Sequence, residues 1–257
     1  MKSITLALGL LTLLLSNAFA EQAATSKAEF CANNVSGDTI KSMLLSSENR
    51  LTFTNRGGLA NGGVCWWHSR FTRKALYLAI YRPDLPKPSN KEAAKIVKAI
   101  RMGKGVVEVP GFKNLSDFSR THRKQIQDRL EKWQIGDGFL RGQWAVGLWG
   151  GSDTTAAKMQ KRMDDLFQDV MVKKDITYQV LQLPGIVAHA WLVVNMEKTS
   201  NGYKIQVIDS NYSSPRTHTY KRGDTHLTLG YFGKMVGRTG KRSELKKMKK
   251  IIKKYCK

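Results

Sequence analysis

The stretch from residue 61 to 69 places a cysteine, Cys65, shortly after a Gly-Gly turn signal and at the start of a run compatible with a helix. The start of a helix presents unpaired backbone N–H groups and a partial positive charge, and both favour a thiolate over a thiol. Cys65 is therefore a candidate nucleophile. The competing interpretation is a buried structural cysteine, since free cysteine is among the most buried residue types.

Two later stretches could supply the other groups that thiol chemistry needs. His189 lies in an apolar, β-branched run, 187–194, of the kind that forms a buried strand. An alternating strand, 203–209, leads to Asp209 and Asn211, and either side chain could orient an imidazole. The order Cys, His, then Asp or Asn is that of hydrolases in which a base activates the thiol and a third group holds the base.

The residues Cys65-Trp66-Trp67-His68-Ser69 resemble the Cys-Trp-x-x-Ser signature of papain-like cysteine peptidases, and His189-Ala190 resembles the His-Ala of that superfamily. The spacings from Cys65 to His189, and from there to Asp209 or Asn211, are of the family's order. The resemblance implies a triad of Cys65, His189 and Asp209 and a thioester acyl-enzyme. It also implies a peptide or protein substrate, with neither a metal nor a cofactor.

Two alternatives share this resemblance. The same triad can serve acyl transfer of the transglutaminase or glutamine deamidase type, because those reactions begin with the same acyl-enzyme. A protein that keeps the fold but lacks turnover would instead be a cationic envelope-binding module.

The sequence also departs from the family's pattern. The glutamine that forms the family's oxyanion hole normally lies six residues before the nucleophile, where this chain has Leu59. Asn55 and Asn61 are nearby amides, but neither occupies that position, and Asn61 is our candidate for a second oxyanion donor. The family's cysteine three residues before the nucleophile is Gly62 here. These differences indicate a distant member, so the substrate and bond specificity are not carried over.

Three helices are expected in the first part of the chain. The first runs from Cys65 to Tyr81 and ends before a group of prolines. Ser89 and Glu92 form a capping box for a second helix, which ends at Gly103. Apolar residues from 118 to 133 mark a third, ending near Gly136, in which His122 is a packing or surface residue.

The second part of the chain is expected to be strand-rich from about 176 to 232, so the fold class is α+β. The mature chain, residues 21–257, is expected to form one papain-like catalytic domain of two lobes. The helix-rich lobe, about 21–175, carries the cysteine at a helix start, and the antiparallel lobe carries the histidine and the aspartate. A lysine-rich terminal helix, 241–257, follows.

The register of one hairpin decides whether His189 and Asp209 share a face of the sheet. A loop over residues 196–202 would place His189 directly opposite Asp209, and directly opposite residues lie on one face. A two-residue turn at Asn201-Gly202 would instead pair Val194 with Asp209 and turn His189 to the other face. The catalytic hypothesis therefore requires the longer loop or a bulge.

Residues 1–20 have the pattern of a secretory signal peptide, with Lys2 before an apolar core and Ala18-Phe19-Ala20 as a cleavage site. The apolar run is short for a membrane span of about 20 residues. We therefore expect a secreted or periplasmic protein whose mature chain begins near Glu21.

The formal net charge is +23, although 41% hydrophobic residues and six tryptophans are typical of a globular protein. Such a chain is attracted to anionic polymers and surfaces. We find no nucleic-acid-binding motif, so the expected partner, besides a peptide substrate, is an anionic envelope or membrane surface. The terminal helix, 241–257, would contact that surface or dock its apolar stripe on the domain, and amphipathicity alone favours docking.

The three cysteines, Cys31, Cys65 and Cys256, allow three pairings, and the sequence alone does not choose among them. An activated Cys65 must stay unpaired to act as a nucleophile. On that hypothesis one pairing remains, a disulfide between Cys31 and Cys256 that ties the two ends of the mature chain together.

Overall fold

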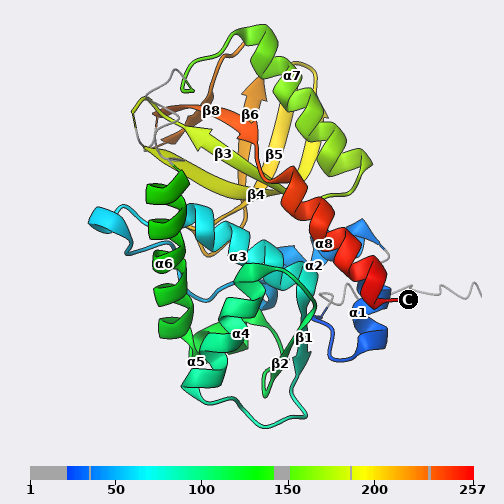
Figure 1. Ribbon diagram of the computed structural model, residues 1–257. Coiled ribbons are helices and arrows are strands. Elements are labelled where there is room, and N and C mark those ends of the chain that lie inside the picture. The colour runs from blue at the N-terminus through cyan, green and yellow to red at the C-terminus, as the bar shows by residue number, and fades with distance from the viewer. Residues whose placement is uncertain (1–21, 35, 142–150, 186, 231–232) are drawn as a thin grey trace, which may run out of the picture.

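The chain has an α+β fold, with helices in the first part and an antiparallel sheet in the second (Figure 1). The computed structural model describes residues 22–34, 36–141, 151–185, 187–230 and 233–257, and the predicted signal peptide lies outside them. The first part contains α1 (Lys27–Asn33), α2 (Gly37–Leu45), α3 (Cys65–Leu78), α4 (Asn90–Met102), α5 (Leu115–Thr121) and α6 (Arg123–Arg141). Two 3-10 turns, η1 (Ser47–Asn49) and η2 (Leu59–Asn61), and a parallel pair of strands, β1 (Ala79–Arg82) and β2 (Val107–Pro110), complete it.

The second part is built on a sheet with the strand order β6-β5-β4-β3-β8-β7, in which all neighbours are antiparallel. A helix, α7 (Ala156–Phe167), and a π-helical turn, η4 (Gln168–Val172), precede it. The strands are β3 (Thr177–Gln182), β4 (Ala188–Thr199), β5 (Gly202–Asp209), β6 (Arg216–Lys221), β7 (Leu227–Leu229) and β8 (Gly233–Thr239), and α8 (Arg242–Tyr255) follows. The predicted end of this part near residue 232 was too early, because β8 returns to pair with the free edge of β3.

The strand β4 is buried on both faces, which explains its almost continuous apolar sequence. Leu192 joins the core that contains α3, whereas Trp191 and Val193 join a second core with residues of α7. Figure 1 shows α7 over one side of the sheet and α3 on the other. All fourteen residues of α3 are buried, so this helix is held on every side.

The hairpin of β4 and β5 has neither predicted register. Thr199 pairs with Gly202 across a two-residue turn, and the register shifts at a bulge between Val193 and Asn195, so that Trp191 lies opposite Asp209. The longer loop was therefore wrong, and the bulge that the hypothesis allowed is present. Without the extra residue in β4, Asp209 would face Leu192 and His189 would point to the other face.

Of the three helices predicted in the first part, one is found as predicted, one ends earlier and one is divided. The capping box of Ser89 and Glu92 is present, and α4 ends with Gly103 in the left-handed conformation, as predicted. The helix from Cys65 stops at Leu78 rather than Tyr81, because the chain turns into β1 and pairs with β2. The third predicted helix is divided into α5 and α6.

The division between α5 and α6 occurs at His122, which is the C-cap of α5. Its buried ring packs against Phe112 and Phe118, at centroid distances of 5.5 and 5.3 Å. Continuing past the predicted end at Gly136, α6 reaches Arg141.

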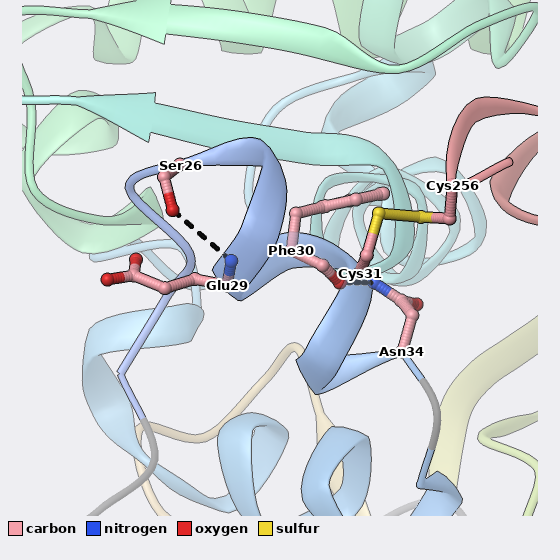
Figure 2. Close-up of a disulfide and its surroundings, with 6 residues drawn as sticks. All are labelled: Ser26, Glu29, Phe30, Cys31, Asn34 and Cys256. Atoms are coloured by element: carbon pink, nitrogen blue, oxygen red, sulfur yellow. Dashed lines mark hydrogen bonds between the residues drawn. A yellow bond between two sulfur atoms is a disulfide. The ribbon is translucent and has the colours of Figure 1, made fainter.

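The two ends of the described chain are joined by the predicted disulfide between Cys31 of α1 and Cys256 after α8 (Figure 2). Ser26 caps α1 by accepting a hydrogen bond from the Glu29 N–H. Disulfides persist in oxidising compartments, which fits an exported protein. Within the described ranges, no helix combines the length and the apolar character needed to cross a bilayer.

Candidate active site

Cys65 is the first residue of α3, as the sequence analysis predicted, and it is a free cysteine. One face of α3 lies along the backbone of β4. The Cys65 Sγ is 3.8 Å from the Ala188 carbonyl oxygen, and the Ser69 hydroxyl donates to the Ala190 carbonyl at 3.2 Å. Because Ala188 and Ala190 flank His189, these contacts hold the start of α3 beside the histidine.

The residue before Cys65, Val64, has no side-chain oxygen with which to cap the helix. Its N–H instead donates to the side-chain oxygen of Asn55, nine residues earlier in the chain. The Asn55 amide nitrogen donates to the Asn211 side chain at 3.0 Å, and the Asn55 N–H donates to the Ser210 carbonyl at 2.7 Å. Asn55 therefore ties the loop before Cys65 to the segment that follows Asp209.

The loop before Cys65 has an unusual backbone. Gly57, Gly58, Ala60, Asn61 and Gly63 all have positive φ. At Gly63, φ is 84°, and a Cβ atom would overlap the side-chain amide of Asn55. Only glycine satisfies both conditions without displacing Asn55.

The helix α6 supports the same loop from outside. Gln134 accepts a hydrogen bond from the Leu59 N–H at 2.9 Å and donates one to the Gly63 carbonyl at 2.9 Å. One turn further along α6, Asp137 accepts hydrogen bonds from the Trp67 indole and from Arg70, at 3.2 and 2.8 Å. Both the loop and the first turns of α3 are thus fastened to one helix.

His189 and Asp209 meet at the same end of the sheet, where β4 begins and β5 ends. The His189 Nε2 lies 2.8 Å from a carboxylate oxygen of Asp209, Oδ1. Both side chains are almost fully buried, with 3% and 4% of their surface exposed. Since a carboxylate only accepts, Nε2 carries the proton and Nδ1 is the nitrogen available to another partner.

That other partner is Cys65, whose side chain is hydrogen-bonded to His189. Burial by itself disfavours the imidazolium. The negative charge of Cys65 and the hydrogen bond to Asp209 outweigh burial and raise the pKa of His189 to about 10. The imidazolium form of His189 is therefore favoured at neutral pH, and its positive charge lies beside the Cys65 sulfur.

Asn211, the alternative group for orienting His189, has its side chain against Asn55. Its backbone N–H donates to Asp209 Oδ1 at 2.9 Å, and its side-chain oxygen accepts from Asn55. The Asn211 side chain thus contacts the Asn55 amide, whereas Asp209 contacts the histidine.

Asn61, the candidate for a second oxyanion donor, lies in η2 with an exposed side chain. Within the described part of the chain, no hydrogen bond joins its amide to Cys65, His189 or Asp209. The backbone N–H of Cys65 is the donor that the start of α3 provides, because the first N–H groups of a helix have no partner within it.

A second buried histidine, His68, lies one turn after Cys65. One of its ring nitrogens, Nε2, is 2.9 Å from the Phe53 carbonyl oxygen, and burial lowers the pKa of His68 to about 4. His68 is therefore uncharged at neutral pH, and its Nε2 is already hydrogen-bonded to the Phe53 carbonyl oxygen. In the described ranges, no group of three or more His, Cys, Asp or Glu side chains is arranged to hold a metal ion.

The sequence predicted the three residues of the buried chain, Cys65, His189 and Asp209. It did not identify Asn55 or Gln134 as residues that position the loop. The signals in the sequence were indirect, namely the amide at position 55 and the glycine at 63.

Comparisons with protein-family models, curated proteins and solved structures give no match for this chain.

Proposed function

We propose that this protein is a papain-like cysteine hydrolase, acting as a peptidase or amidase through Cys65, His189 and Asp209. The observation that supports the proposal is the buried, hydrogen-bonded chain from the thiol through the imidazole to the carboxylate. A free thiol at a helix start, paired with a histidine that a third group orients, is the arrangement used for nucleophilic catalysis on carbonyl compounds.

In the proposed reaction, the Cys65 thiolate attacks the carbonyl carbon of an amide, and the electron pair of the C=O bond moves to oxygen. The tetrahedral intermediate then expels the amine, which takes its proton from His189 Nδ1. A thioester remains on Cys65. Water attacks it and gives a proton to His189, and the carboxylic acid leaves as the thiolate is restored.

The other groups act on charge and orientation. Asp209 accepts the hydrogen bond from His189 Nε2, so Nδ1 keeps facing Cys65 and the imidazolium is stabilised. The backbone N–H of Cys65 would donate to the oxyanion of the intermediate. The thiol mechanism itself requires no metal or cofactor.

The experiment that tests this proposal combines an electrophilic thiol probe with a peptide library, using the wild-type protein and Cys65→Ala. We expect the probe to label Cys65 and mass spectrometry to find cleaved peptides, both only in the wild type. Deamidated glutamines, or new amide cross-links with added amines, would instead indicate the transglutaminase or deamidase type of reaction. A protein that neither reacts with the probe nor changes any peptide would be a binding module, and the proposal would be wrong.

A further inference from the structure

The exposed side of α8 carries a continuous stripe of lysines. Six lysines of the helix are exposed. Lys249 pairs with Asp175, and the other five form the stripe: Lys246, Lys247, Lys250, Lys253 and Lys254. At 100° per residue they fall within an arc of about 120°, and the stripe is about 12 Å long. No salt bridge within the described residues engages any of the five.

The helix has no apolar face left for another partner. Leu245, Met248 and Ile252 are buried in the core that contains α3. They lie nearly opposite the lysine stripe around the helix axis. Contact with a surface would therefore be electrostatic and would leave the apolar residues of the helix in place.

The only acidic residue of 241–257, Glu244, is also withdrawn from the exposed side. It forms ion pairs with Arg70, Arg73 and Lys74 of α3, at 2.8, 3.1 and 3.1 Å. Turning this carboxylate inward leaves the exposed stripe without a negative charge of its own. The same ion pairs and the Cys256 disulfide (Figure 2) fasten α8 at both ends, so the stripe is a fixed surface.

A hollow adjoins the stripe at Lys253. It has a volume of about 400 Å³ and lies between α8 and the start of α2. Lys173, Lys174 and Lys249 also line it, although each is paired with an aspartate. Phosphate groups that project from a planar surface would find positive charge both along the stripe and in this hollow.

We propose that the lysine stripe of α8 binds the headgroups of an anionic phospholipid bilayer and holds the protein peripherally on that surface. A planar layer of phosphates matches a straight, fixed row of ammonium groups on one side of a helix. The disulfide indicates an oxidising compartment, where a membrane is a more accessible polyanion than nucleic acid. Binding is expected to depend strongly on salt, because no apolar residue is inserted.

The test measures binding of the purified protein to vesicles of phosphatidylcholine with and without phosphatidylglycerol, by co-sedimentation. One variant replaces Lys247, Lys250 and Lys254 by Gln. The matched control replaces Lys91, Lys95 and Lys98 of α4 by Gln, which removes the same charge from another exposed helical face. Glutamine has a helix propensity close to that of lysine, so both variants should keep their helices.

We expect the wild type to bind only the anionic vesicles and to be released at about 1 M salt, where the screening length is about 3 Å. The α8 variant should bind on the order of 100-fold more weakly, while the α4 variant should bind as the wild type does. An equal loss in both variants would mean that net charge alone drives binding, and the proposal would fail. It would also fail if the α8 variant lost affinity for duplex DNA but not for the vesicles. None of these outcomes depends on whether Cys65 is catalytic.

Discussion

At the scale of single residues, the proposed chemistry depends on the charge state of two buried groups. Cys65 is only 6% exposed, and a buried thiol far from charge would stay protonated and inert. Here His189 lies against it, with a pKa raised to about 10 by the charge of Cys65 and the hydrogen bond to Asp209. The protonated imidazole of His189 therefore lies beside the Cys65 sulfur, where the proposed thiol chemistry needs a positive charge.

This pairing predicts the pH dependence of thiol reactivity. Alkylation of Cys65 by iodoacetamide, followed by mass spectrometry, should already be fast at pH 6 to 7 and should change little up to about pH 10, where His189 begins to lose its proton. In His189→Ala the rate should rise only near the ~8.5 of an ordinary thiol. The same late rise in the wild type would show that no activated thiolate is present.

The third group is predicted to be Asp209 rather than Asn211, because the carboxylate contacts the imidazole and the Asn211 side chain does not. Asp209→Ala should lower the rate of peptide hydrolysis by 10²-fold or more, since the imidazolium loses its acceptor. Asn211→Ala should cost less, because the backbone N–H that binds Asp209 remains. Full activity in Asp209→Ala with loss in Asn211→Ala would reverse the assignment.

Residue types and order were sufficient to select the buried chain of three side chains. A cysteine after a Gly-Gly turn and a histidine in an apolar strand are local patterns. The role of Asn55 was not predictable in this way, because its partners Val64, Ser210 and Asn211 come from two distant parts of the chain. Contacts of that kind exist only once the sheet and the helices have been assembled.

At the scale of elements, the loop before α3 must be held because the helix lacks a side-chain cap of its own. Asn55→Ala should slow the alkylation of Cys65 by about fivefold, since one buried hydrogen bond contributes about 1 kcal/mol and its loss leaves the Val64 N–H unpaired. Gly63→Ala should have a similar effect, because its Cβ displaces Asn55.

The matched control for these variants is Asn61→Gly, which removes an amide from the same loop but keeps the positive φ favourable. Its alkylation rate should equal that of the wild type, because the Asn61 side chain is exposed. Melting temperatures separate a local shift of the loop from unfolding. If Asn61→Gly lost reactivity or hydrolysis and Asn55→Ala did not, Asn61 rather than Asn55 would be the amide that supports the site.

The hairpin shows why element boundaries are easier to predict than registers. The strand at 187–194 follows from its apolar, β-branched run, and the strand at 203–209 follows from the alternation of residue types. The bulge near Val194 depends on how β4 bends between its two apolar cores, and nothing in the local sequence requires it. One extra residue in that strand nevertheless decides whether His189 faces Asp209.

The ion pairs between α3 and α8 predict an acid-sensitive element. Burial would raise the pKa of Glu244, but Arg70, Lys74 and Arg73 lower it from 4.5 to about 2. A carboxylate with a lowered pKa stabilises the folded state above pH 4.5, and this contribution is lost as the pH falls toward 2. Urea titrations of the wild type should therefore show the free energy of unfolding falling steeply across this window.

The variant Glu244→Gln should be less stable at pH 7 by about 3 kcal/mol, because Arg73 and Lys74 lose their ion pair with Glu244 and Arg70 keeps only its ion pair with Asp137. Its stability should depend less on pH between 4.5 and 2. Glu197→Gln is the control, since Glu197 is exposed and its ion pair with Lys204 is long, at 3.7 Å. Equal slopes in the wild type and Glu244→Gln would contradict the lowered pKa.

At the scale of the whole molecule, composition and periodicity were sufficient for the α+β class and for the order of helices before strands. They were not sufficient for the end of the sheet, because β8 is placed by its pairing with β3 rather than by its own pattern. The amphipathic pattern of 241–257 favoured docking of this helix on the domain, as observed, but it did not identify the helix against which α8 packs. Docking follows from the burial of Leu245, Met248 and Ile252 against a helix that lies far away in the sequence.

The disulfide between Cys31 and Cys256 closes a loop with a sequence separation of 225 residues. In the chain-entropy model, such a cross-link stabilises the folded state by ~5 kcal/mol, chiefly by restricting the unfolded chain. Replacing both cysteines by serine should lower the free energy of unfolding by up to this amount, measured by urea titration. The alkylation rate of Cys65 should stay unchanged, because α8 remains held on α3 by the ion pairs of Glu244. Reduction of the wild type should reproduce the loss of stability. If non-reducing peptide mapping found Cys65 bridged to either partner, both the disulfide and the thiol mechanism would be wrong.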